Sequence, residues 1–211
     1  VFYSIARVLF YVYNSSLIKV DGVIDFLKLC FHGLAFDTTT ILYVNSLFII
    51  GSIIPVLHNS RKKYQKTLFY LYFIPNLVAY SSNFIDFIYY RYTFSRSTIA
   101  SLDTLENESN KTLLFFDFLL NYWHVFLLFI LTTVVWIVLY KKVKISTKPY
   151  SKGVLSYVLT SVACFLLMIT LMVGGIRGDF RKSTRPINLV DANRHTSKIQ
   201  HADFILNTPF T

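Results

Sequence analysis

Two ionisable residues, Arg7 and Asp86, lie inside apolar stretches of this 211-residue chain. A charge within a membrane is costly, so such a residue is a functional candidate that usually faces a partner of opposite charge. Asp86 lies one turn from the end of its apolar stretch, and Arg91 follows five residues later. The sequence therefore predicts an intramembrane polar site at Asp86 and Arg91. A structural ion pair, with Arg91 or with another helix, is the alternative.

Other residue types that could do chemistry form weaker patterns. The sequence holds no phosphate-binding glycine loop, no zinc-protease motif and no serine-hydrolase motif. Cys30 and Cys164 lie in separate apolar segments, which is typical of packing residues rather than of a disulfide or a metal site. Two histidines and two aspartates lie at loose spacing near the C-terminus, an arrangement that favours a solvated linker over a metal site: His195, His201, Asp191 and Asp203. We predict no catalytic and no metal-binding residue in this chain.

Long apolar helices must position these residues. Hydrophobic residues make up 54% of the chain and charged residues 15%, whereas a soluble domain has about a quarter charged residues. Runs of about 20 apolar residues span a hydrocarbon core as helices, and their continuity excludes a β-barrel. We predict an all-α fold, a polytopic bundle of five transmembrane helices whose first helix is truncated at its N-terminal end. The predicted spans are 1–13, 38–57, 67–90, 119–140 and 154–176.

Basic residues predict the orientation of these spans. The connection 57–67 holds four lysines or arginines and the connection 140–154 holds five, and neither holds an acid. The positive-inside rule therefore places both connections and the N-terminus in the cytoplasm, and the C-terminus outside it. This topology also explains the net charge of +10. Because no nucleic-acid-binding motif accompanies that charge, we expect no nucleic-acid partner.

Residues 18–34, between the first two predicted spans, are amphipathic at helical spacing. The apolar face holds Val20, Val23, Ile24, Leu27, Cys30, Phe31 and Leu34, and the polar face holds Asp21, Asp25, Lys28 and His32. One interpretation is a helix that lies in the outer membrane interface or over the mouth of the bundle. The other is an ordinary extension of the second span.

The C-terminal region, residues 177–211, is polar and carries a distinctive pattern. GGIRGDF ends the last apolar run, RPIN begins at residue 185 and LNTPF begins at residue 206. This pattern resembles the stem of lipoteichoic acid synthase-like membrane proteins, the phosphoglycerol transferase/sulfatase family of the alkaline phosphatase superfamily. Asp179 departs from the family pattern, which more often has a second glycine there. The matching residues are Arg177, Arg185, Pro186, Ile187, Asn188, Ala192, Leu206, Asn207, Thr208, Pro209 and Phe210.

The resemblance implies that residues 1–176 are the transmembrane domain, and residues 177–211 the extracytoplasmic stem, of an enzyme in the bacterial cytoplasmic (inner) membrane. In the family, the extracytoplasmic domain carries a threonine nucleophile and a divalent metal, commonly Mn²⁺. That domain transfers a phosphoglycerol-type group from a lipid donor or hydrolyses a related ester. It would follow Thr211, so the resemblance places no catalytic residue and no cofactor in this chain.

The expected partners follow from this interpretation. They are the phospholipid bilayer with an anionic or lipid-linked donor, the protein's own C-terminal extracytoplasmic domain, and further subunits of a membrane complex. Five residues are candidates for lipid-headgroup or stem contacts, with simple stop-anchoring as the alternative: Arg177, Arg181, Lys182, Arg185 and Asn188. The alternative function is a non-catalytic membrane subunit or scaffold. A transporter is disfavoured because the sequence shows no inverted repeat.

Overall fold

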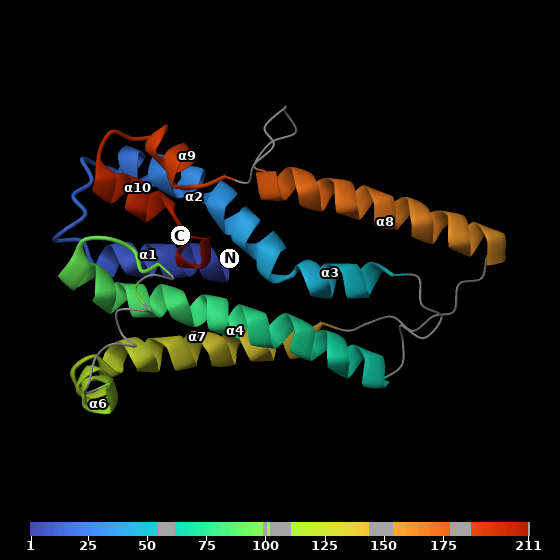
Figure 1. Ribbon diagram of the computed structural model, residues 1–211, viewed down its shortest axis with the longest axis horizontal. Coiled ribbons are helices and arrows are strands. Elements are labelled where there is room, and N and C mark those ends of the chain that lie inside the picture. The colour runs from blue at the N-terminus through green and yellow to red at the C-terminus, as the bar shows by residue number, and fades with distance from the viewer. Residues whose placement is uncertain (55–61, 99–100, 102–110, 144–153, 178–186, 211) are drawn as a thin grey trace.

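The computed structural model describes residues 1–54, 62–98, 101, 111–143, 154–177 and 187–210, and every regular element in them is a helix (Figure 1). This confirms the all-α prediction for the described part of the chain. Helices satisfy backbone hydrogen bonds internally, as long apolar segments require. The elements are α1 (Phe2–Tyr13), α2 (Val23–Val44), α3 (Ser46–Ile53), α4 (Lys62–Thr93), α6 (Lys111–Asn121), α7 (Trp123–Lys142), α8 (Val154–Arg177), α9 (Leu189–Asn193), α10 (Ile199–Ile205) and the 3-10 helix η1 (Thr208–Phe210).

The lengths and apolar character of these helices indicate a membrane protein. Among the described residues, α7 and α8 are each long and apolar enough to cross a membrane, and α2 with α3 also qualifies when the two count as one bent span. Helix α4 has 32 residues, about 48 Å at 1.5 Å per residue, but it is more polar. Helix α1 has only 12 residues. The described residues therefore hold two or three candidate spans, and the count of five stays a prediction.

Within the predicted span 38–57 the helix breaks at Asn45, a bend that the sequence did not indicate. Helices α2 and α3 meet there at an angle of 62°. The Asn45 side-chain amide donates to the carbonyl oxygen of Ile41 at 2.8 Å and also exchanges hydrogen bonds with Asn76 of α4. A side chain that binds a carbonyl group of its own helix often bends the helix.

Most of the amphipathic stretch 18–34 forms the first part of an extended second helix, and its placement in the outer membrane interface stays a prediction. Helix α2 begins at Val23 and runs without interruption to Val44. The apolar side chains near its start do not pack over the mouth of the bundle. They are exposed instead: Val23, Ile24, Leu27, Phe31 and Leu34.

Contacts between the helices define one bundle with α8 at its side (Figure 1). Helix α1 packs against α2, α4 and α10, while α7 packs against α4. Helix α8 contacts α2 and α3, and the Thr39 hydroxyl donates to the carbonyl oxygen of Gly175 at 3.1 Å where these helices approach closely. The core between α1, α2, α4 and α10 is rich in aromatic rings, such as those of Phe10 and Tyr90 at a centroid distance of 5.1 Å.

Candidate functional site: a buried polar junction between the bundle and its C-terminal segment

The chain ends in a segment that enters the helix bundle, which we call the C-terminal plug (residues 199–210). A capping box starts α9 just before it. The Asn188 side chain accepts from the amide of Val190 at 3.0 Å, while the Asp191 carboxylate accepts from the amide of Asn188 at 2.9 Å. Beyond α9 the chain turns inward, and every residue from 201 to 208 is buried. A polar stem was expected here, so this burial is the main structural departure from the sequence interpretation.

Arg7 of α1 holds the plug from one side. Its guanidinium Nη1 donates to the carbonyl oxygens of Phe204, Ile205 and Leu206, where α10 ends. The last carbonyl groups of a helix have no partner within the helix and carry partial negative charge, so a cation stabilises them. The guanidinium Nη2 donates to the carbonyl oxygen of Gly33 at 3.0 Å. Arg7 therefore caps α10 from inside the bundle.

Asp37 of α2 completes this half of the junction. Its carboxylate lies 2.5 Å from Arg7 Nη2 and accepts from the hydroxyl of Ser4 at 3.0 Å. The side-chain amide of Asn207 donates to the same carboxylate at 2.8 Å. Both members of the ion pair are buried, so each needs these additional hydrogen bonds to offset the loss of water. Asn207 of the plug is part of that compensation.

A second buried ion pair joins Asp86 of α4 to Arg96 in the segment that follows α4, at 3.3 Å. Asp86 is fully buried and also accepts from the amide of Ser97 at 2.9 Å and from the hydroxyl of Thr208 at 2.5 Å. Arg96 Nη1 donates to the same Thr208 hydroxyl at 2.9 Å. Thr208 of the plug therefore bridges the two charges.

Arg96 also reaches α10 and the aromatic core. Its Nε donates to the carbonyl oxygen of Asp203 at 2.6 Å, and its guanidinium lies 4.1 Å from the ring centroid of Phe10. The Asp203 carboxylate accepts from the hydroxyl of Tyr90 at 3.2 Å. Burial raises the pKa of Asp203, and nearby Arg96 partly offsets that rise. Arg7 and Arg96 therefore both bind the plug.

The contact between Thr208 and Asp86 pairs a hydroxyl with a potential base, as in a nucleophilic site. Thr208 is only 7% exposed, however, and its hydroxyl is engaged by Asp86, Arg96 and Asn83. The pocket described below does not border it. The arrangement therefore supports positioning of the plug rather than attack on a substrate.

Asp86 and Arg91, the predicted polar site, do not form a pair. Asp86 binds Arg96, whereas the Arg91 guanidinium lies over the ring of Tyr13 at 5.2 Å from its centroid. Arg91 lies five residues after Asp86 on the same helix, and this spacing directs the two side chains to different faces. The sequence interpretation missed Asp37 and Arg96, which fall just outside the predicted spans.

The structure describes two of the five residues that were proposed for headgroup or stem contacts. Arg177 is the last residue of α8, and Asn188 caps α9. Arg181, Lys182 and Arg185 lie outside the described residues.

The four residues considered as a metal site lie apart from one another. The ring of His195 stacks on that of His32 at 4.0 Å, and His201 Nε2 lies 2.8 Å from the carbonyl oxygen of Lys19. Asp191 caps α9, while Asp203 faces Tyr90. His201 and Asp203 are buried rather than solvated. Within the described part of the chain, no three His, Cys, Asp or Glu residues are placed to hold a metal ion.

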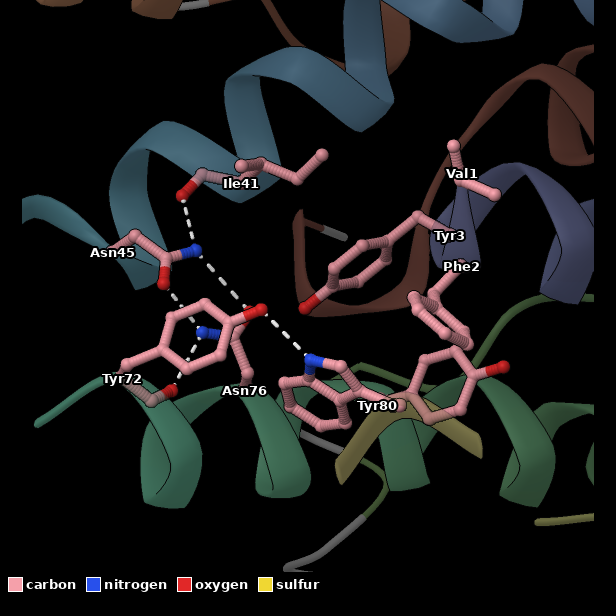
Figure 2. Close-up of a pocket in the computed structure, with 9 residues that line it drawn as sticks. Val1, Phe2, Tyr3, Ile41, Asn45, Tyr72, Asn76 and Tyr80 are labelled. Carbon is pink, nitrogen blue, oxygen red and sulfur yellow. Dashed lines mark hydrogen bonds between the residues drawn. The ribbon is translucent and has the colours of Figure 1, made fainter. Parts of the chain in front are cut away.

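A pocket of about 180 Å³ lies deeper in the bundle, beside the start of α1 and the bend between α2 and α3 (Figure 2). The paired amides of Asn45 and Asn76 form one wall, and Trp136 Nε1 donates to the hydroxyl of Tyr72 at 2.7 Å. The buried hydroxyl of Tyr3 borders the same space. The amide pair ties the bend to α4, and the bond between Trp136 and Tyr72 ties α7 to α4.

Comparison of the chain with protein-family models, curated proteins and solved structures finds no match. The family resemblance of the C-terminal pattern therefore stays a prediction.

Proposed function

We propose that this chain is the membrane-anchoring region of a lipoteichoic acid synthase-like enzyme of the phosphoglycerol transferase/sulfatase family. The enzyme acts on lipid-linked or envelope substrates at the outer face of the bacterial cytoplasmic membrane. One observation carries the proposal. The LNTPF pattern on which the resemblance rests supplies Asn207 to Asp37, and Thr208 to Asp86 and Arg96.

This placement gives the pattern residues a physical role. A flexible stem would leave the position of any domain that follows it undefined. A plug held by two buried ion pairs instead fixes the direction in which the chain leaves the bundle. Holding an enzyme close to a lipid-linked substrate raises the effective concentration of the substrate at the active site.

The proposed topology has five spans, with α1 and α4 added to the three candidates. Ring centroids of Phe69 near the start of α4 and Tyr140 near the end of α7 lie 5.1 Å apart, so the basic ends of these helices share one side of the bundle. The plug contacts α4 at Asp86 and Tyr90, near the opposite end. This supports a cytoplasmic basic side and an extracytoplasmic plug.

The product of the natural gene tests this proposal. It is purified, reconstituted with fluorescent phosphatidylglycerol and Mn²⁺, and assayed for the formation of fluorescent diacylglycerol. The proposal predicts turnover that chelation of the metal abolishes. A natural product that ends at Thr211, or an intact one that leaves several phosphate and sulfate esters unchanged, contradicts it.

A second candidate is a non-catalytic membrane subunit or scaffold, and helix α8 favours it. Only 6% of the apolar window of α8 is buried within the chain. Such a helix is free to face lipid or another subunit. Stoichiometric co-purification of fixed membrane partners, without ester turnover, would favour this candidate over the enzyme.

A further inference from the structure

Arg91, at the end of α4, is a cation that takes no part in the two ion pairs that hold the plug. In the described part of the chain, its guanidinium pairs with no carboxylate and lies over the ring of Tyr13. Stacking on an aromatic face leaves the edge of a guanidinium, with its N–H donors, open to an anion. The Arg91 side chain is exposed, so an anion can reach it.

Polar aromatic side chains of α1, α4 and the start of α7 lie near Arg91. The hydroxyl of Tyr13, at the end of α1, lies 3.2 Å from Nε2 of His124 in α7. The hydroxyls of Tyr92 and Tyr122 share a hydrogen bond beside them. These groups add further hydrogen-bond donors around the guanidinium. We call Tyr13, Arg91, Tyr92, Tyr122 and His124 the Arg91 cluster.

The Arg91 cluster lies at the boundary of a candidate membrane span. Trp123 is the first residue of α7 and is 62% exposed, which is typical of the interface between lipid and water. Beyond it, Leu127 and Leu131 form an exposed apolar strip along the same helix. A ligand that fits both features has an anionic head and a hydrocarbon tail.

We propose that the Arg91 cluster binds the phosphate of an acidic phospholipid, with an acyl chain lying along Leu127 and Leu131 of α7. Arg91 supplies the charge-assisted hydrogen bonds, and the tyrosine hydroxyls complete the shell around the phosphate oxygens. The proposal depends on α7 crossing the membrane and does not depend on the proposed enzyme function.

Quenching of tryptophan fluorescence tests this site in the whole chain. The protein has two tryptophans, so Trp136→Phe leaves Trp123 beside the cluster as the only reporter. This variant is reconstituted in bilayers that contain brominated phosphatidic acid or brominated phosphatidylcholine. The ratio of the two quenching curves gives the preference of the site for the acidic lipid. Phosphatidic acid is chosen because it carries the phosphate with no further headgroup.

We expect a preference of about fivefold for phosphatidic acid, the effect of one basic residue near a membrane surface. Arg91→Gln should reduce the preference to about one. Lys28→Gln is the matched control, because Lys28 is an exposed single charge near the start of α2, which lies at the same end of the bundle as the end of α4 (Figure 1). This variant should leave the preference unchanged. Circular dichroism and the melting temperature show that each variant is folded.

Three results would overturn the proposal. The first is an unchanged preference in Arg91→Gln, and the second is an equal loss in Lys28→Gln, which indicates diffuse surface charge. The third is loss of the preference when millimolar inorganic phosphate replaces chloride at constant ionic strength. That result would assign the site to free phosphate rather than to a lipid.

Discussion

Replacing Asp86 by alanine should release the C-terminal plug. Asp86 is the carboxylate that compensates the buried charge of Arg96 and accepts from the hydroxyl of Thr208. In the variant, Arg96 keeps its bonds to the carbonyl oxygen of Asp203 and to Thr208 but loses its counter-charge. Opening of the plug then costs less free energy than in the parent chain, because it lets water reach the unpaired guanidinium.

The size of the effect follows from the burial of the pair. Both side chains are at most 3% exposed, and removing one partner of such a pair costs about 3–5 kcal/mol. The bonds that Arg96 retains favour the lower end of this range. About 1.4 kcal/mol corresponds to a factor of ten in an equilibrium constant, so the open fraction should rise on the order of 100-fold.

Amide hydrogen exchange of the protein in nanodiscs measures this opening. Residues 199–206 should exchange on the order of 100-fold faster in Asp86→Ala than in the parent chain, if they exchange by local opening. Amides in the middle of α7 should be unaffected. The exposed bridge between Asp21 and Lys198 provides the control, and Asp21→Asn should leave the exchange of α10 unchanged.

A second variant separates the charge effect from a general loss of packing. Asp86→Ala combined with Arg96→Met removes both charges and keeps an apolar chain against Phe10. This double variant should recover most of the protection of α10, since an ion pair replaced by apolar residues is often close to neutral. If α10 stays fully protected in Asp86→Ala, or if the double variant is less protected than the single one, the reasoning is refuted.

Two further predictions concern the same junction. A Cβ atom on Gly33 would lie 2.5 Å from Cζ of Arg7, whose guanidinium is fixed by its hydrogen bonds. Gly33→Ala should therefore destabilise the protein by about 1–3 kcal/mol in thermal unfolding. Gly22→Ala is the control, because a Cβ atom there meets open space, and it should not destabilise the protein. Equal melting temperatures for the two variants would contradict this. Because burial raises the pKa of Asp203 above its unfolded value, the folded state binds the proton more tightly, and the carboxyl adds stability as the pH falls through the raised pKa. Asp203→Asn should raise the melting temperature at pH 7 and reduce the gain in melting temperature as the pH is lowered through the raised pKa of Asp203, and an unchanged pH dependence would contradict this assignment.

The apolar runs predicted much of the helical framework, because a membrane leaves an apolar backbone few alternatives to a helix. The predicted spans 119–140 and 154–176 correspond closely to α7 and α8. The break at Asn45 was not predicted. The Asn45 side chain, which binds the carbonyl oxygen of Ile41 in its own helix, is also held by Asn76, a partner that lies 31 residues away and leaves no local signal.

The candidate site was only partly predictable for the same reason. Asp86 was identified because it interrupts an apolar stretch. Its partner Arg96 follows the helix in a polar segment, where a charge is unremarkable in the sequence. The contacts of Arg7 with α10 join residues almost 200 positions apart. In the sequence, the plug has one short apolar run, Phe204–Leu206, within a polar region, which is typical of a linker. Only its contacts with Arg7 and Arg96 in the structure identify it as a buried segment.

The central structural claim is that two buried ion pairs hold the C-terminal plug in one position within the bundle. A spin-label distance measurement tests it most directly, with labels at the exposed positions Ile199 of α10 and Val12 of α1 after Cys30 and Cys164 are replaced by alanine. We predict a single narrow distance distribution that broadens when Asp37 and Asp86 are both replaced by alanine. A broad distribution in the parent chain, or one that the double replacement leaves unchanged, would contradict the claim.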